Sequence, residues 1–157
     1  MAKGEMKMQP RPRVLFLCTG NSARSQMAEG CLRHLAGHLF EAFSAGTEPK
    51  GMNPLAVEAM RELGVDIAGH RSKKVDEFIG QKLEWVVTVC DHAREHCPFL
   101  PATHSLHWSL EDPAAAQGTH TEKLAVFRKV RDQILGRIKH ELIGENGTRE
   151  RDELFSQ

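Results

Sequence analysis

The stretch RVLFLCTGNSARSQMAEG, residues 13–30, decides the expected fold of this 157-residue chain. Its first six residues form an apolar run without polar alternation, which is typical of a strand buried on both faces of a parallel sheet. A polar loop follows, and Met27, Cys31 and Leu35 then recur at steps of four, as in a helix with Ser25 as its N-cap. The stretch therefore predicts a buried strand, a loop and a helix in direct succession.

The same succession of apolar runs and helical patterns continues along the chain. WVVTVC, residues 85–90, repeats the first strand and also carries a cysteine at its carboxyl end. Residues 40–45 and 103–108 are predicted as further strands, and helices are expected from Asn53-Pro54 and from Thr121. The apolar stripe of the last helix consists of Leu124, Phe127, Val130, Ile134 and Ile138. Strands that alternate with helices predict a doubly wound α/β fold, with a four-stranded parallel sheet and helices on both faces.

Length and composition limit the classes of protein that this chain can represent. One domain is expected at residues 12–142, between a flexible N-terminal extension (1–11) and a flexible polar tail (143–157). Basic and acidic residues both number 21, so no net charge favours nucleic acid or an anionic membrane as a partner. No segment resembles a signal peptide or a membrane span, so we expect a cytoplasmic protein, with a monomer as the default state.

The four cysteines are expected to serve catalysis, metal binding or packing, because static disulfides are rare in a reducing compartment. Cys18 and Cys90 both stand at the carboxyl ends of predicted parallel strands. In sheets of this kind, ligands bind beyond the carboxyl ends of the strands, at the topological switch point. The positions of these two cysteines therefore point to a functional site.

The residues after Cys18 have the composition of an anion-binding loop built around a nucleophile. Backbone amides of a tight loop at a helix N-terminus hold a tetrahedral oxyanion, and Gly20 and Asn21 suit the curled backbone. Arg24 can bind two oxyanion oxygens through its planar guanidinium, and its charge favours the thiolate form of Cys18. Ser25 can donate a hydrogen bond to that thiolate. The expected oxyanion-binding residues are Thr19, Gly20, Asn21, Ser22, Ala23 and Arg24.

The spacing of Cys18 and Arg24 alone would also fit a buried structural cysteine and a surface arginine. The whole string CTGNSARSQMAEG, however, resembles the phosphate loop of the low-molecular-weight tyrosine phosphatase fold. Within that fold the chain most resembles the thioredoxin-coupled arsenate reductases, from about Val14 to Ile138. Four further stretches carry this likeness: SAGT (44–47), VVTVCDHAREHCP (86–98), HWSLEDPA (107–114) and FRKVRDQI (127–134).

The resemblance implies a thiol–disulfide relay that reduces arsenate to arsenite. Cys18 would attack arsenate, or hold phosphate or sulfate as analogues, and Asp112 would protonate the departing oxygen. Cys90 would then attack Cys18 and release arsenite, and Cys97 would displace Cys18 from Cys90. Thioredoxin would reduce the resulting Cys90–Cys97 disulfide. The catalytic residues implied are thus Cys18, Arg24, Ser25, Cys90, Cys97 and Asp112, with no cofactor.

A geometric argument sharpens the relay. If residues 90–97 formed one helix, the Cα atoms of Cys90 and Cys97 would lie about 10.5 Å apart, at a rise of about 1.5 Å per residue. A disulfide tolerates at most about 7 Å between Cα atoms. We therefore expect this segment to unwind or loop out on oxidation, and Pro98 prevents a helix from continuing beyond it.

Three departures from the pattern of relatives concern residues near the loop. Ala23 stands where many relatives have a cysteine, and Cys31 is expected to be a core residue outside the relay. Potassium-binding relatives use positions that match Asn21, Glu29 and Ser44, but their acidic ligand falls at Lys73, so no metal site is expected. Among the histidines, His70 alone could border the site, by analogy with relatives.

Two alternative functions remain open at the level of sequence. A tyrosine phosphatase would use Cys18, Arg24 and Asp112 alone, but phosphatases of this fold usually place an aromatic pair after Asp-Pro, where this chain has three alanines. A zinc-binding regulatory protein would use Cys90, His92, His96 and Cys97, and would leave the Cys18 loop unexplained. Arsenite formation that depends on thioredoxin, its reductase and NADPH would separate the relay from both alternatives.

Overall fold

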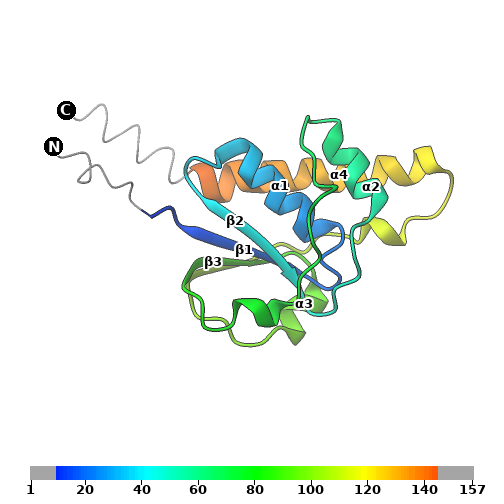
Figure 1. Ribbon diagram of the computed structural model, residues 1–157. Helices are drawn as coiled ribbons and strands as arrows, with labels where there is room; N and C mark the ends of the chain where they lie inside the picture. Colours follow the sequence, from blue (N-terminus) through cyan, green and yellow to red (C-terminus); the bar gives the residue numbers. More distant parts are fainter. Residues whose placement is uncertain (1–9, 145–157) are drawn as a thin grey trace, which may run out of the picture.

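The computed structural model describes residues 10–144 and contains a four-stranded parallel sheet (Figure 1). The strands follow the spatial order β2-β1-β3-β4. In this order the chain reverses direction across the sheet between β1 and β3, which makes the gap between their carboxyl ends the switch point. The strands are β1 (Arg13–Cys18), β2 (Glu41–Gly46), β3 (Leu83–Thr88) and β4 (Ala102–His107).

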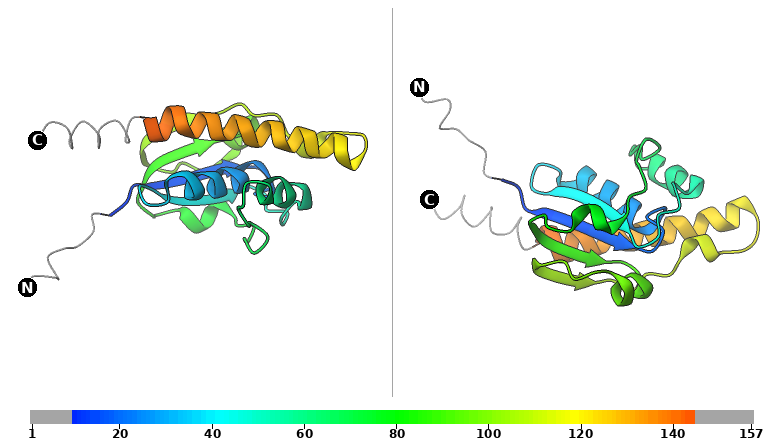
Figure 2. Two further views of the ribbon diagram at one scale, coloured as in Figure 1. Left: turned by 90° about the horizontal axis from the view of Figure 1, so that it is seen from above. Right: turned by 60° about the horizontal axis from the view of Figure 1, so that its bottom comes forward.

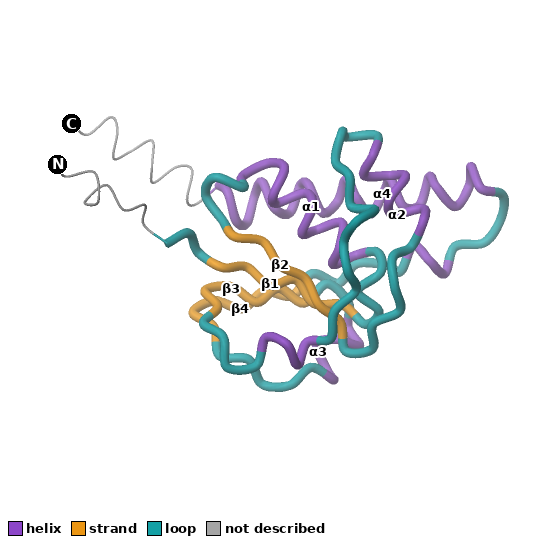
Figure 3. Tube along the Cα trace, in the orientation of Figure 1, coloured by secondary structure: helices purple, strands orange, loops and turns teal. Residues whose placement is uncertain are grey.

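Helices cover both faces of the sheet, as predicted. Helices α1 and α4 lie side by side over one face, α2 packs against both of them, and α3 contacts β1 and β3 from the opposite face (Figures 1 and 2). Figure 3 shows α1 and α3 on opposite sides of the strands. The helices are α1 (Arg24–Ala36), α2 (Pro54–Arg61), α3 (Asp91–His96) and α4 (His120–Arg137), with short helical segments η2 (Val75–Phe78), η3 (Pro113–Ala115) and η4 (Ile138–Ile143).

The core forms where the apolar strands meet α1 and α4. Phe16 of β1 is fully buried and its ring lies 5.8 Å from that of Trp108. The predicted stripe of the last helix is buried as expected. Burial of large side chains on both faces of β1 explains its continuous apolar sequence. The central strand, which carries Cys18 at its end, is thereby held rigidly.

Several predicted boundaries are corrected by the structure. Strand β3 ends at Thr88, two residues before Cys90, because Cys90 serves as the N-cap of α3 and its sulfur accepts from the amide of Ala93. Strand β4 begins and ends one residue earlier than predicted. Helix α4 begins at His120, because Thr119 and Glu122 form a capping box. The cap of α1 is Ala23 and not Ser25.

Residues at both ends of the expected domain, 12–142, also make contacts with the rest of the fold. Arg11 belongs to the expected extension, but its guanidinium donates to the carbonyl of Phe40, 3.4 Å away. At the other end, the last helical turn runs to Ile143, which packs against the core. Most of the expected extension and tail lies outside the described residues. Among residues 10–144, no helix combines the length and apolar character needed to cross a membrane.

Candidate active site

The candidate site lies at the switch point, where β1 and β3 deliver two cysteines to the same edge. Leu17 pairs with Thr88 in the parallel register, and the amide of Val89 donates to the carbonyl of Leu17 at 2.8 Å. Because strands β1 and β3 run in the same direction, Cys18 and Cys90 leave the sheet beside one another. Both thiols are free, and both residues are buried.

The loop after Cys18 is held so that its carbonyl groups point outward. Neighbouring segments donate to its carbonyl oxygens: the amides of residues 47, 48, 50 and 53, and the hydroxyl of Ser72. In a peptide unit, the N–H points opposite to the C=O, so this arrangement turns the loop amides inward. The amide of Asn21 accordingly donates to Cys18 Sγ at 3.2 Å. Amides that point inward in this way can hold an oxyanion.

Two backbone positions permit this curl. Asn21 is the only described non-glycine residue with a positive φ, at 48°, a conformation that asparagine tolerates better than most residues. Gly46, at the end of β2, lies directly against the loop. A Cβ at Gly46 would lie 2.5 Å from the carbonyl oxygen of Thr19 and 2.8 Å from the nitrogen of Asn21. Only glycine lets β2 approach the loop this closely.

The sulfur of Cys18 lies in a network of polar side chains. Ser25 Oγ is 2.9 Å from Cys18 Sγ, as expected for a hydroxyl that donates to the thiolate. The amide of the Asn21 side chain donates to Ser25 Oγ at 2.8 Å, and Gln26 donates to Asn21 Oδ1 at 3.0 Å. The hydroxyl of Ser25 is engaged with Cys18 and Asn21, so it does not cap the helix as predicted. The structure places Ser25 against Cys18, where the sequence analysis expected a hydrogen bond.

Arg24 and Asp112 face the same cavity as Cys18. Arg24 Nη1 donates to the carbonyl of Leu110 at 3.1 Å, and its Nη2 lies 4.0 Å from Asp112 Oδ2. Asp112 Oδ1 accepts from the amide of Ala114 at 3.0 Å, which leaves Oδ2 on the side of Arg24. This arrangement can bind an anion and deliver a proton beside it.

The cavity has a volume of about 390 Å³. It brings together the predicted residues Cys18, Thr19, Gly20, Ser22, Ala23, Arg24 and Asp112. Lys50, His92 and Ala114 also line it, and the first two were not predicted for this role. Lys50 follows SAGT in sequence and adds a positive charge at the rim. Among the described residues, His92 has the one aromatic ring that lines the cavity, which suits a small inorganic anion better than a phosphotyrosine ring.

Cys90 and Cys97 stand at the two ends of α3. Thr19 Oγ1 lies 3.4 Å from Cys90 Sγ, so the second cysteine contacts the loop that holds the first. Cys97 is the C-cap, is partly exposed, and its amide donates to the carbonyl of Ala93 at 2.9 Å. Burial raises the pKa of the Cys97 thiol. A regular helix therefore separates the two cysteines, as in the geometric argument made from the sequence.

A cluster of polar side chains around the buried carboxylate of Glu29 is connected to the loop. Glu29 accepts from Ser44 Oγ at 2.7 Å and lies 3.9 Å from Lys73 Nζ and 3.0 Å from Arg33 Nη2. The backbone amide of Lys73 donates to Asn21 Oδ1 at 2.8 Å, which connects the cluster to the loop. Burial lowers the pKa of Lys73, and the charge of Glu29 opposes that shift. The ammonium of Lys73 thus lies beside the carboxylate that potassium-binding relatives use.

Two other sequence expectations are settled by position. His70 does not line the cavity: its Nδ1 lies 3.0 Å from Gln26 Oε1 and 3.4 Å from Glu29 Oε2, beneath the loop. Burial lowers the pKa of His70. Cys31 is fully buried, its sulfur lies 3.9 Å from that of Met60, and burial raises its pKa to about 12. It is therefore a core residue.

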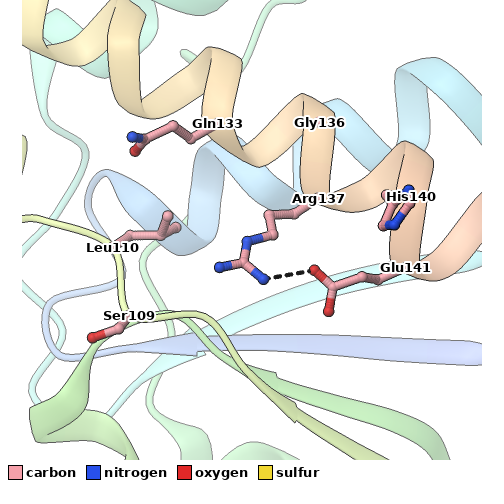
Figure 4. A pocket seen from close by; sticks show the side chains of 7 residues that line it. All are labelled: Ser109, Leu110, Gln133, Gly136, Arg137, His140 and Glu141. Atoms are coloured by element: carbon pink, nitrogen blue, oxygen red, sulfur yellow. Dashed lines mark hydrogen bonds and ion pairs between the residues drawn. The ribbon is translucent and has the colours of Figure 1, made fainter.

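A second hollow, of about 480 Å³, lies between α4, η4 and the segment Ser109–Leu110 (Figure 4). Arg137 Nη1 and Glu141 Oε2 form an ion pair of 2.9 Å in it. None of the predicted catalytic residues lines this hollow. Within residues 10–144, no group of three or more His, Cys, Asp or Glu side chains is arranged to hold a metal ion.

Comparison with known proteins agrees with this geometry. Residues 13–146 match the family described as low molecular weight phosphotyrosine protein phosphatase, and the chain belongs to this family. Within it, the chain is 50% identical to an arsenate reductase of Halalkalibacterium halodurans over 127 residues. The aligned residues cover 80% of this chain and 91% of the relative.

Solved structures show the same likeness. An arsenate reductase in the phosphate binding state is 32% identical, with a TM-score of 0.71, and the match covers 85% of this chain and 98% of that one. A thioredoxin-dependent arsenate reductase of Corynebacterium glutamicum is 32% identical, with a TM-score of 0.66, over 88% of this chain and 63% of that one. The fold and the sequence thus place the chain among the arsenate reductases of the phosphatase family.

Proposed function

We propose that the protein reduces arsenate to arsenite through a relay of Cys18, Cys90 and Cys97, and that thioredoxin regenerates it. The observation that carries this proposal is the contact of Cys90 with Thr19, 3.4 Å from sulfur to hydroxyl, at the rim of the oxyanion cradle. A phosphatase needs one cysteine in the cradle. A second thiol at its edge serves a reaction in which electrons leave the protein as a disulfide forms.

In the first step, the Cys18 thiolate forms a bond to the arsenic of arsenate, and one oxygen leaves as water. Ser25 stabilises the thiolate, the loop amides and Arg24 bind the remaining oxygens, and Asp112 donates the proton to the departing oxygen. The product is a covalent Cys18–arsenic adduct in which arsenic is still pentavalent. The role of Asp112 parallels that of a general acid in phosphate-ester hydrolysis.

In the second step, the Cys90 thiolate attacks Cys18 Sγ. The sulfur–arsenic bond breaks, its electron pair passes to arsenic, and arsenite leaves as a Cys18–Cys90 disulfide forms. Arsenic gains two electrons, and the two cysteines lose two. Thr19 and the amide of Ala93, which contacts Cys90 Sγ at 3.4 Å, hold the attacking sulfur beside the loop.

In the third step, the Cys97 thiolate attacks Cys90 Sγ and releases Cys18 as a thiolate. The helical spacing across α3 exceeds the reach of a disulfide, so α3 must unwind. The new Cys90–Cys97 disulfide then oxidises thioredoxin. We propose the cytoplasm as the compartment, because thiols are kept reduced there and thioredoxin can serve as the reductant.

Single cysteine variants test the relay. After addition of arsenate, the Cys97→Ser protein should release one arsenite per chain and accumulate a Cys18–Cys90 cross-link, detected by mass spectrometry. The Cys90→Ser protein should release none. Both variants should still hydrolyse para-nitrophenyl phosphate, because ester hydrolysis needs only Cys18, Arg24 and Asp112.

The matched control is Cys31→Ser, which changes a buried cysteine outside the relay and should retain thioredoxin-dependent arsenite formation. If Cys18 and Cys90 both remain free thiols in the Cys97→Ser protein, and wild type makes no arsenite with thioredoxin, the relay is wrong. The protein would then be a phosphatase that uses the same cradle. We propose that ester hydrolysis is in any case a side activity, because the cradle accepts any tetrahedral oxyanion.

A further inference from the structure

Four polar side chains form a hydrogen-bonded group at the carboxyl ends of β3 and β4, outside the residues assigned above. His107 Nδ1 lies 2.7 Å from Thr88 Oγ1, and His107 Nε2 lies 2.7 Å from Asp91 Oδ1. Ser109 Oγ donates to the same Asp91 oxygen at 2.9 Å. We call Thr88, Asp91, His107 and Ser109 the His107 clamp.

The clamp holds the chain on both sides of Cys90. Thr88 is the last residue of β3, and Asp91 is the first residue of α3. A single imidazole bridges these two flanks: in its neutral form, Nε2–H donates to the Asp91 carboxylate and Nδ1 accepts from the Thr88 hydroxyl. Hydrogen bonds from His107 and Ser109 lower the pKa of the Asp91 carboxyl, so this acceptor is charged at neutral pH.

The two ends of α3 are held very differently. The amino-terminal end has the clamp, the contact of Cys90 with Thr19, and the fully buried Ala93. The carboxyl-terminal end has the partly exposed Cys97, followed by Phe99, which is 87% exposed. When α3 unwinds, the end without a clamp is free to move first.

We propose that the His107 clamp is a positioning device for the relay: it fixes Cys90 against the Cys18 loop while Cys97 moves to it. This inference rests on the proposed function, since positioning has a purpose only if Cys90 attacks Cys18. Asp91 and His107 touch neither substrate nor the reacting sulfurs. They act through the backbone of residues 88–91.

Figure 4 shows that the Ser109 hydroxyl points away from Arg137 and Glu141 of the second hollow. The partner of this hydroxyl is Asp91 Oδ1. Ser109 directly precedes Leu110, whose carbonyl accepts from Arg24. The clamp therefore lies beside the active site without lining its cavity. Loss of the Asp91 carboxylate should loosen Cys90 and leave the Cys18 loop intact.

The test compares Asp91→Ala with Asp91→Asn, both in the Cys97→Ser protein so that only the first disulfide forms. The stability of the Cys18–Cys90 disulfide is titrated against glutathione and glutathione disulfide, which accepts two electrons and two protons from the thiols. For Asp91→Ala we expect this disulfide to be about tenfold less stable, a midpoint potential about 30 mV less negative. Asp91→Asn retains an oxygen acceptor for His107 and should fall between Asp91→Ala and the unchanged chain.

Single-turnover arsenite release should slow by about the same tenfold factor in Asp91→Ala, while hydrolysis of para-nitrophenyl phosphate should change less than about twofold. The matched control is Glu58→Ala, which removes the exposed pair of His120 Nε2 and Glu58 Oε2, 2.9 Å apart, between α4 and α2. It should leave both quantities unchanged. An unchanged disulfide stability in Asp91→Ala would overturn the clamp.

A fall in ester hydrolysis equal to the fall in arsenite release would also overturn it, since the residue would then act on the whole site. The redox titration needs no arsenate. If wild type fails to reduce arsenate but the titration shows the tenfold loss, the clamp stands and the proposed function fails. If wild type reduces arsenate but the titration shows no loss in Asp91→Ala, the proposed function stands and the clamp fails.

Discussion

The Cys18 loop and the α3 segment hold the cysteines of the proposed relay in opposite ways. Every loop carbonyl from residue 18 to residue 22 accepts a hydrogen bond from a neighbouring segment, and Cys18 Sγ has polar partners on two sides. Helix α3 has only six residues, buries Ala93 alone, and ends at a partly exposed cysteine. The carbonyl groups of the Cys18 loop thus all have hydrogen-bond partners. Helix α3 is held by few contacts.

This difference fits the chemistry that we propose for each region. Binding an anion and stabilising charge at a fixed point benefits from donors that do not reorganise during the reaction. Passing a disulfide from Cys18 to Cys97 requires a segment that changes shape, which weakly packed structure permits. The predictions below therefore test whether the loop is intolerant of change.

The largest expected effect is the loss of the nucleophile. Cys18→Ser should lower both arsenate reduction and ester hydrolysis by about 10⁴-fold or more, because both reactions begin with the thiolate. Steady-state rates with arsenate and with para-nitrophenyl phosphate provide the measurement. Arg24→Ala should also impair both reactions, since the anion loses its guanidinium. Substantial ester hydrolysis by Cys18→Ser would remove Cys18 from this role.

The next largest effect should come from the proton donor. Asp112→Asn should lower the rate of the chemical step by about 100-fold or more, because the departing oxygen loses its acid. Phosphate binding, measured as the rise in melting temperature with added phosphate, should persist because the loop amides and Arg24 remain. A collapse of phosphate binding would mean that Asp112 organises the cavity and is not the acid.

Gly46 tests the close packing of the loop against β2. A Cβ there would lie within 2.8 Å of two loop backbone atoms, so Gly46→Ala should destabilise the protein by about 1–3 kcal/mol and weaken phosphate binding. Chemical denaturation with and without phosphate measures both effects. The control is Gly136→Ala on α4, where a Cβ meets no atom within 4 Å. Equal stabilities of the two variants would contradict the tight contact.

The rigid part of the site was more predictable from the sequence than the moving part. The strand, the loop and Arg24 are local in sequence, so the string CTGNSARSQMAEG was enough to predict their structure and to suggest their role. The apolar run at residues 85–90 did not mark the end of β3, because burial continues at Val89 and Cys90 after the strand pairing ends. Tertiary contacts bring Lys50 and His92 to the cavity and place the His107 clamp beside it, and no local pattern indicates these contacts.

Cys31, which is fully buried on α1, provides a smaller test, of the packing of the core. Burial raises its pKa from the ordinary value of 9.0 to about 12, so between these values the thiol ionises in the unfolded chain and stays neutral in the folded one. Its contribution to stability is full below pH 9 and is lost as pH rises toward about 12. Unfolding free energy should therefore fall less steeply above pH 9 in Cys31→Ala than in wild type. The chain has no tyrosine, which removes one competing titration. Parallel pH profiles would show that Cys31 ionises in the folded state.

The smallest effect is expected for potassium, because the buried carboxylate beneath the loop already has a cation from the chain itself. Lys73 Nζ lies 3.9 Å from Glu29 Oε1, and Arg33 Nη2 lies 3.0 Å from Glu29 Oε2. A potassium ion would have to enter against these two positive charges and displace existing hydrogen bonds. Melting temperatures and arsenate reduction rates in potassium and sodium chloride of equal ionic strength should therefore agree, with melting temperatures within about 1 °C, since an ion that does not bind adds no stability. A marked rise in melting temperature with potassium alone would show that the ammonium of Lys73 leaves room for an ion, and that the loop is less completely satisfied by the chain than its contacts indicate.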